Sequence, residues 1–518
     1  MSTLRFALFA SLLIPGQLFA QDLGQSTPSV DLAKLDAFIA NAQEEWNVPG
    51  LAVAIVKDGK VVHAKGYGVR ELNKPEKVDA DTVFAIASNT KAFTAAALAI
   101  LVEEGKVDWK DPVRKHLPWL ELYDPYVTAE LRVDDLLCHR SGLGTFSGDL
   151  LWWGTAYSPE QVLRRAKHLE PAGSFRAQYG YSNLMFLAAG EVIAKASGMS
   201  WQKFIESRIL KPVGMSRSVT SVKDLEDHSN VATPHKPTPD TITAIPWYNW
   251  DTMAAAGGII SSVNDMSKWM ITQLNNGRLQ DDQRLFSDAS SWRMWSPHTV
   301  IPVRKSRLRR YPTTHFRAYG LGWSLSDYKG RKTASHGGGY DGMYSRVALV
   351  PEEGLGVVVL TNSMTGISTA IANTVIDEYL GGKKTDWSTS GLASDIRNRK
   401  QFYDRIKAAT TPRATGTKPS LAPEQYTGTY TGPMYGDATV TKEGDRLVLR
   451  LQPNKDLVAD LKHLHHDTYI IKWRQEFAWF GSGTATFVLN AKGDVEEMKL
   501  DVPNDDLWFC ELEFRRIQ

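Results

Sequence analysis

Apolar and polar residues follow two different spacings near the start of the chain. From Leu32 to Trp46 the apolar side chains recur every three or four residues, which predicts an amphipathic helix. Residues 51–56 and 61–69 are two strand-like segments, and Asp58-Gly59 lies between them. An Asp-Gly pair between two such segments is a strong signal for a β-hairpin. The pattern therefore predicts a helix followed by two antiparallel strands.

The same two spacings return further along. Helices are expected at residues 90–104, 159–167, 184–197, 201–209 and 367–379. Strands are expected at 345–350 and 356–361, on either side of a turn at Pro351–Gly354. We expect one sheet, built from the beginning and the end of this region, with helices packed around it.

The pattern changes near residue 383. A charged helix at 396–408 leads into a stretch rich in Thr, Pro and Gly at 410–423, so we interpret residues 383–420 as a linker. Beyond it, short strands alternate with turns, at 428–430, 438–440, 447–451, 468–473, 485–489 and 497–500. Even spacing of this kind predicts a small antiparallel barrel or sandwich over residues 421–518.

Composition excludes some functions. The 518 residues are 42% hydrophobic and 23% charged, as in an ordinary globular protein, and the net charge of +2 gives no reason to expect nucleic acid or an anionic membrane as partner. Cys138 and Cys510 lie far apart and form no CxxC pair, which speaks against a disulfide framework or a zinc site. His463, His465, His466 and Asp467 are more typical of an exposed strand than of a metal site. We expect no metal and no cofactor.

The first 20 residues resemble a signal peptide. Arg5 is followed by an apolar run from Phe6 to Leu13, and Ala20 is a small residue suitable for cleavage. The run is too short to span a membrane stably. We expect export to a periplasm or the exterior; the alternative is a buried N-terminal helix.

Ser88 and Lys91 are the first candidates for chemistry. Three residues apart at the start of a predicted helix, they would lie on one face, where the lysine amine can reach the serine hydroxyl. A serine becomes a good nucleophile when a neighbour takes its proton, and burial lowers the pKa of a lysine enough for it to do so. Alone, the pair is equally compatible with a helix cap and a surface lysine.

Two later segments carry further candidates. Tyr181 precedes a predicted helix and is suited to relay protons, and Asn183 is suited to bind a substrate carbonyl. His336 begins a run of glycines through Gly339, where the backbone can approach a ligand closely. Each segment alone is more typical of a loop. The His-Gly-Gly-Gly run also occurs in lipases, but their G-x-S-x-G motif is absent from this chain.

Together, in this order, these segments resemble the serine β-lactamase and penicillin-binding-protein family. Its pattern is S-x-x-K, then Y-x-N, then K-T-G or H-x-G, which here are Ser88–Lys91, Tyr181–Asn183 and His336–Gly338. The tyrosine makes the chain similar to the class C side, which includes D-amino-acid peptidases and esterases. The resemblance implies an α/β (α+β) domain of the β-lactamase/transpeptidase type over residues 30–382, with helices around an antiparallel sheet. The C-terminal all-β barrel is similar to the lipocalin-like domain of some relatives.

The resemblance also implies roles. Ser88 forms the acyl-enzyme, Lys91 is the base, and Tyr181 relays protons, while Asn183 orients the substrate. The oxyanion would be bound by the N–H groups of Ser88 and Gly339. His336-Gly337-Gly338 replaces Lys-Thr-Gly, which removes a cation that grips β-lactams and makes His336 a further catalytic candidate.

We therefore predict a secreted serine hydrolase. The preferred interpretation is a peptidase that acts on peptides with D- or non-standard residues, such as peptidoglycan-type or linearised cyclic peptides. The alternative is a carboxylesterase with the same site, followed by a β-lactamase or a non-catalytic penicillin-binding sensor. The partner is a peptide or small molecule, and a homo-oligomer is left open. The aromatic segments Trp152-Trp153 and Pro246–Trp250 are candidates for the walls of a substrate cleft. The basic residues at 304–310 are interpreted as a solvated loop, with contact to a substrate carboxylate as the alternative.

Overall fold

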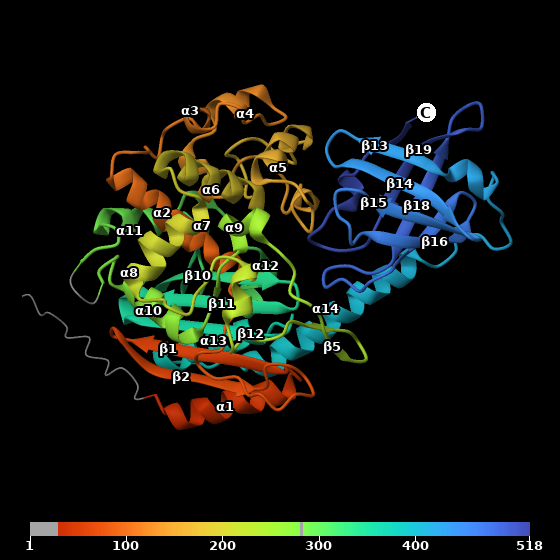
Figure 1. Cartoon of the computed structure of the whole chain (residues 1–518). Coiled ribbons are helices and arrows are strands. Elements are labelled where there is room, and N and C mark those ends of the chain that lie inside the picture. Colours follow the sequence, from red (N-terminus) through yellow and green to blue (C-terminus); the bar gives the residue numbers. More distant parts are fainter. Residues whose placement is uncertain (1–29, 280–282, 518) are drawn as a thin grey trace, which may run out of the picture.

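The computed structural model describes residues 30–279 and 283–517, so the predicted signal peptide lies outside the described residues. The first domain is built on an eight-stranded antiparallel sheet of order β2-β1-β12-β11-β10-β9-β8-β7 (Figure 1). Its strands are β1 (Gly50–Lys57), β2 (Lys60–Gly68), β7 (Thr299–Val300), β8 (Arg317–Tyr319), β9 (Ser324–Tyr328), β10 (Arg331–Tyr340), β11 (Met343–Val350) and β12 (Leu355–Thr361). The early hairpin therefore pairs with the late one, through β1 and β12, as the sequence predicts.

The sheet is buried on both faces. Along β1, Ala52 and Ala54 point into one core, while Leu51 and Val53 point into the other. Because successive side chains of a strand face opposite sides, an almost continuous apolar strand needs cover on both. The helices α1 (Leu32–Glu45) and α13 (Ile367–Leu380) supply it on one side (Figure 1).

The larger helical region covers the other side. Its central helices are α2 (Thr90–Glu103) and α6 (Asn183–Ser197), which pack against each other. The remaining helices of this domain are α3 (Val113–His116), α4 (Pro125–Glu130), α5 (Pro159–Arg165), α7 (Trp201–Ile205), α8 (Lys211–Val213), α9 (Ala254–Gly257), α10 (Val263–Leu274), α11 (Asp288–Met294) and α12 (Lys305–Arg310). Small two-stranded sheets join β3 (Phe84–Ala85) to β6 (Ile260–Ser261) and β4 (His235–Pro237) to β5 (Ile242–Ala244).

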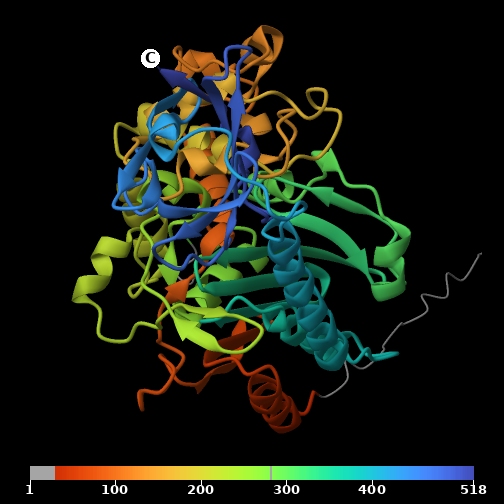
Figure 2. The ribbon, with the colours of Figure 1, turned by 90° about the vertical axis from the view of Figure 1, so that its right-hand side faces the viewer.

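A long helix leads from this domain to the second. α14 (Trp387–Ala409) begins nine residues before the predicted helix, because the Asp386 side chain accepts a hydrogen bond from Thr389 N–H and Trp387 is buried. Much of the segment interpreted as a linker is therefore helical, and in Figure 2 this helix leads up to the barrel.

The second domain is a closed eight-stranded barrel, which confirms the predicted all-β unit. Its strands are β13 (Gly428–Gly432), β14 (Gly436–Glu443), β15 (Arg446–Leu451), β16 (Val458–His465), β17 (Thr468–Trp473), β18 (Gly483–Leu489), β19 (Val495–Asp501) and β20 (Phe514–Ile517). The sequence pattern did not reveal β16 and β20. β20 is four residues long and half arginine, so its apolar signal is weak.

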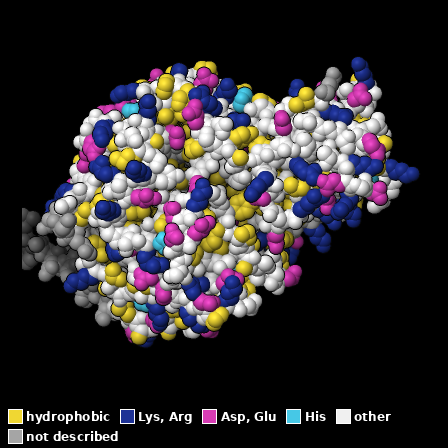
Figure 3. Space-filling view, viewed as in Figure 1, with side chains coloured by type: hydrophobic (Ala, Val, Ile, Leu, Met, Phe, Trp, Pro, Cys, Tyr) yellow, Lys and Arg dark blue, Asp and Glu magenta, His cyan; other side chains and the backbone are white. Residues whose placement is uncertain are grey.

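The barrel packs against the segment of the first domain at residues 147–153. Glu511 accepts hydrogen bonds from Ser147 Oγ at 2.5 Å and from Gly148 N–H at 2.8 Å. Trp153 packs edge-on against Phe477 and Phe480 of the barrel, with ring centroids 5.4 Å apart. On the face seen in Figure 3, acidic and basic side chains are intermixed over both domains.

Candidate active site

Ser88 lies at the start of helix α2. It belongs to a single 3-10 turn, Ala87–Asn89, and Lys91 follows one turn later at the beginning of the helix. Lys91 Nζ donates a hydrogen bond to Ser88 Oγ at 3.1 Å. Ala87 has a φ of 48°, a conformation that non-glycine residues rarely adopt and that is found at functional sites. The predicted serine–lysine pair is therefore in hydrogen-bond contact.

The amine of Lys91 is fully buried. It also donates to Asn183 Oδ1 at 2.8 Å and to the carbonyl oxygen of Ala256 at 2.9 Å. Burial lowers the pKa of Lys91 from 10.5 to about 7, and the charge of Asp149 works against this decrease. Near neutral pH a large fraction of the amine is unprotonated and can accept a proton.

Asp149 is a site residue that the sequence analysis missed. Its Oδ2 accepts a hydrogen bond of 2.7 Å from the amide of Asn183, and its Oδ1 accepts one of 3.0 Å from Trp152 Nε1. Burial raises the pKa of Asp149 to about 7. Asn183 is thereby fixed between Lys91 and Asp149, with its carbonyl toward the amine and its amide nitrogen toward the carboxyl group.

Tyr181 lies over the same amine. Lys91 Nζ is 4.9 Å from the centre of its ring, and both Ser88 and Tyr181 line the same cavity. Burial raises the pKa of Tyr181 well above its usual value, and the neighbouring Ser88 side chain works in the opposite direction. The ring packs on His139 at a centroid distance of 4.1 Å. Ser88, Lys91, Tyr181 and Asn183 are thus brought together.

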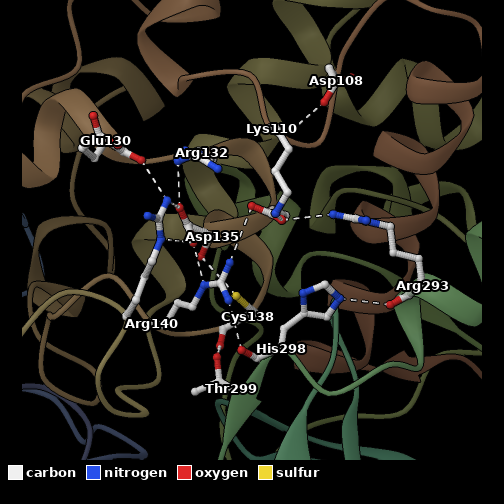
Figure 4. A network of polar contacts seen from close by, with 12 residues as sticks. Asp108, Lys110, Glu130, Arg132, Asp135, Cys138, Arg140, Arg293, His298 and Thr299 are labelled. Carbon is white, nitrogen blue, oxygen red and sulfur yellow. Dashed lines mark hydrogen bonds and ion pairs between the residues drawn. The ribbon is translucent and has the colours of Figure 1, made fainter.

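A network of ion pairs around two buried carboxylates, Asp134 and Asp135, holds the segment that carries His139 (Figure 4). Asp135 pairs with Arg140 and with Arg176, each at 2.6 Å. Asp134 pairs with Lys110 at 2.7 Å and with Arg293 at 3.1 Å. These contacts fix the backbone on both sides of His139, and hence the surface on which Tyr181 rests.

His336 is a neutral ring in this structure. Its Nδ1 lies 2.6 Å from the carbonyl oxygen of Gly337 and its Nε2 lies 2.7 Å from the hydroxyl of Tyr319. Because a carbonyl only accepts, Nδ1 carries the proton and the Tyr319 hydroxyl donates to Nε2. Burial lowers the pKa of His336 to about 3, with the charge of Lys91 as a further cause. The ring lies near Tyr181, but both of its nitrogens are engaged.

The glycines after His336 lie on a strand edge that faces the site. Residues 331–335 of β10 pair with β9, whereas residues 336–340 pair only with β11 on the other side. A Cβ on Gly338 would lie 2.3 Å from the carbonyl oxygen of Ile86, so only glycine lets this strand approach the Ser88 turn. The assignment of Gly339 N–H to an oxyanion hole stays a prediction.

These residues surround a cavity of about 410 Å³. Trp152, Trp153 and Trp250, from the two aromatic segments of the sequence, line it together with Ser88, Tyr181 and His336. The barrel contributes Trp479, Asp506 and Leu507. The Trp479 ring lies 3.1 Å from where a Cβ of Gly339 would be. The second domain therefore forms part of the wall of this cavity, which no local sequence pattern indicated.

The other sequence candidates lie elsewhere. Asp467 accepts hydrogen bonds from Ser420 and Tyr426, and within residues 30–279 and 283–517 no group of three His, Cys, Asp or Glu side chains is placed to hold a metal ion. Cys138 is buried, and burial raises the pKa of its thiol to about 12. In the same ranges, no helix is both long and apolar enough to cross a membrane.

Comparisons with known proteins agree with this geometry. Residues 35–380 match the model of the beta-lactamase family, and the chain belongs to that family. Residues 412–516 match a domain of unknown function (DUF3471). The chain is 30% identical over 431 residues to an unguisins hydrolase of Aspergillus campestris, covering 78% of this chain and 77% of the relative. It is 26% identical over 334 residues to protein flp of Staphylococcus aureus, covering 64% and 62%.

Solved structures share the fold. An octameric penicillin-binding protein homologue from Pyrococcus abyssi superposes with a TM-score of 0.61 at 24% identity, covering 94% of this chain and all of that one. A D-amino acid amidase from Ochrobactrum anthropi gives 0.53 at 22% identity, covering 72% and 99%. The fold, the family and the hydrolase relatives establish the chain as a serine hydrolase of the beta-lactamase family.

Proposed function

We propose that this protein is an exported peptidase that hydrolyses amide bonds in peptides with D- or non-standard residues, through an acyl-enzyme on Ser88. The observation that carries the proposal is the 3.1 Å contact between Ser88 Oγ and a buried Lys91 amine whose pKa is lowered to about 7. Export rests on the signal-like segment at residues 1–20.

Acylation begins with a proton transfer. The unprotonated Lys91 amine takes the hydroxyl proton of Ser88 while Oγ attacks the carbonyl carbon of the substrate, and the carbonyl oxygen becomes an oxyanion. Backbone N–H groups of Ser88 and Gly339 stabilise that charge. The amide C–N bond then breaks, and the leaving nitrogen takes a proton that passes from Lys91 through Tyr181. Water attacks the resulting ester in the second half of the reaction, with the same pair accepting its proton.

The neighbouring side chains hold this pair in position. Asn183 fixes the Lys91 amine through its carbonyl oxygen and is in turn fixed by Asp149. His336, neutral and held by Tyr319, supplies shape and a dipole in place of a cation. A β-lactam carboxylate would find no positive side chain at that position, which favours peptides over antibiotics as substrates.

The cleft and the relatives support the substrate class. Indole rings from both domains line the cavity, which suits a bulky or apolar acyl residue. The similar proteins include two that are named unguisins hydrolases and one that is named a D-amino acid amidase.

The test compares substrates on one enzyme. Wild-type protein is assayed with D- and L-aminoacyl amides, with D-residue peptides, with short-chain nitrophenyl esters and with nitrocefin, and Ser88→Ala is the control. We expect labelling of Ser88 by a fluorophosphonate and turnover of D-configured amides. Ester cleavage without any amide cleavage would establish the carboxylesterase instead, and rapid nitrocefin turnover would establish a β-lactamase.

A further inference from the structure

A second cavity, of about 360 Å³, adjoins the catalytic cavity where the barrel meets the first domain. Helix α14, strand β4 and loops of the barrel wall it, and we call it the side chamber. It contains none of the side chains that carry out the acylation, so the chemistry of the site does not account for it. The two cavities share four lining residues, which form the boundary between them: Tyr344, Gly366, Trp479 and Asp506.

The walls of the side chamber are tied together by charged pairs. The buried Lys236 side chain of β4 pairs with Glu476 of the barrel at 3.2 Å. Asp505 of the barrel pairs with Arg405 of α14 at 2.7 Å. The contacts on both sides of the barrel loops hold the chamber in place. They also satisfy the charges of its lining, since the Arg399 and Asp395 side chains pair with each other at 2.7 Å.

One charged group of the lining has no counter-ion. Asp506, at the boundary with the catalytic cavity, forms no ion pair within residues 30–279 and 283–517. Burial and the charge of Asp505 raise the pKa of Asp506 to about 6, so the carboxylate is mostly ionised at neutral pH. A half-buried negative charge attracts a positive group and repels a negative one. The side chamber is therefore suited to a neutral or positive occupant.

The free edge of β10 gives a substrate its direction. At one end, the ring of Tyr181, which passes the proton to the leaving nitrogen, lies 6.2 Å from the ring of His336. Gly339, the predicted oxyanion donor, lies three residues further along the strand, a distance of about 10 Å. The rings of Trp479 and Tyr344 are 3.1 and 3.3 Å from where a Cβ of Gly339 would be. The acyl part of a substrate therefore leads from Gly339 toward the side chamber.

We propose that the side chamber receives the N-terminal extension of a peptide substrate, beyond the residue whose carbonyl is attacked, and favours neutral or basic side chains over acidic ones there. The inference rests on the proposed peptidase function and narrows its substrates to oligopeptides. The rings of Phe402, Tyr403 and Trp479 supply apolar contact area for such an extension. Asp506 supplies the preference for charge.

The first test measures how binding depends on length, without turnover. In the Ser88→Ala protein, calorimetry compares N-acetyl-D-alanine amide with the same amide extended at its N-terminal side by one and by two leucines. Because burial of about 60 Å² of apolar surface is worth a factor of about ten in affinity, we expect the longest peptide to bind at least about tenfold more tightly than the shortest.

Variants of α14 place that gain in the side chamber. Tyr403→Ala removes a lining ring, and Asn398→Trp fills the chamber from an exposed position on the helix, which is safe for folding. Both are expected to remove most of the gain with length and to leave binding of the shortest amide unchanged. Gln401→Ala is the matched control, because Gln401 is exposed on the same helix and does not line the chamber.

The second test measures charge selectivity. The N-terminal leucine of the longest peptide is replaced by lysine or by glutamate at pH 7.5, where Asp506 is ionised. We expect the lysine peptide to bind about fivefold more tightly than the glutamate peptide at low salt, as for a charge pair near the surface. Asp506→Asn abolishes this difference. Asp494→Asn, which removes an exposed carboxylate elsewhere on the barrel, retains it.

Several results would overturn the inference. These are equal affinity across the length series, absence of binding by all peptides, a gain with length that persists in both Tyr403→Ala and Asn398→Trp, or equal binding of the lysine and glutamate peptides. Turnover by the wild-type protein is measured separately, with 4-nitroanilides of the same acyl series. Hydrolysis that does not rise with acyl length refutes only the side chamber, whereas length-dependent binding without hydrolysis of any amide refutes only the peptidase function.

Discussion

Replacing Lys91 by Met tests the central feature of the site without any substrate. Met has nearly the shape of Lys but no amine. The variant loses acylation, since nothing takes the Ser88 proton. It also changes how stability depends on pH, because the folded and unfolded chains bind the Lys91 proton with different strengths.

The size of this stability change follows from the pKa of Lys91, which is about 7 in the folded protein and 10.5 for an ordinary lysine, as in the unfolded chain. As pH falls below 10.5, the unfolded chain gains a proton that the folded chain does not gain until pH 7. The wild-type protein therefore loses stability over this interval, and the loss is complete below pH 7. At about 1.4 kcal/mol for each pH unit, the full change is about 5 kcal/mol. Lys91→Met does not experience it.

The variant has an opposing cost that does not depend on pH. Asn183 Oδ1 and the carbonyl of Ala256 lose their donor, at about 1–3 kcal/mol each. We therefore expect Lys91→Met to be less stable than wild type at pH 10. Its stability relative to wild type should increase steadily as the pH is lowered to 7. Melting temperatures of both proteins across this range measure the difference.

Two controls make the result specific. Lys60→Met removes an exposed amine, and the Asp149→Asn background removes titration of the neighbouring carboxyl group. A difference between Lys91→Met and wild type that stays constant from pH 10 to pH 7 would refute the reasoning, because it would mean that burial does not lower the pKa of Lys91.

Three further predictions concern the site and the domain contact. The kcat/KM of the wild type rises with pH to a plateau with a midpoint near 7, because Lys91 must be unprotonated, and a pH–rate profile measures this. Gly338→Ala destabilises the fold by about 1–3 kcal/mol and prevents labelling of the nucleophile, because its Cβ would lie 2.3 Å from the carbonyl of Ile86; Gly337→Ala, with 3.8 Å of space, retains both. Glu511→Gln weakens two hydrogen bonds between the barrel and the first domain, so we expect a lower melting temperature and a higher KM. An unchanged KM would mean that the docking of the barrel does not affect substrate binding in the cleft.

Local sequence patterns were sufficient for much of the fold. The hairpin around Asp58-Gly59 and helices α2 and α6 follow from the spacing of apolar residues, which reflects burial directly. Ser88 and Lys91 were predictable as a pair because one helical turn separates them. Tyr181, Asn183 and His336 became candidates through their order along the chain, and the structure brings all of them to one cavity.

The remaining features depend on contacts between distant segments. Asp149 begins a short 3-10 turn in an apolar segment, and nothing near it in the sequence indicates that Asn183 and Trp152 will bind its two oxygens. The neutral state of His336 depends on Tyr319, which lies on another strand. The basic residues near 307 resemble a solvated loop in the sequence, whereas in the structure Arg307 lines a cavity together with Arg317 and Arg346.

The contribution of the barrel to the cleft has a consequence for the order of synthesis. Ser88 and Lys91 leave the ribosome early, but β1 has no partner in β12 until about residue 361 has been made. Trp479 and Asp506, which wall the cleft, come more than a hundred residues later still. Because sequence-distant contacts form last, a nascent or truncated chain would hold the nucleophile in an unfinished and unselective cleft. Activity and selectivity are thus tied to completion of the polypeptide.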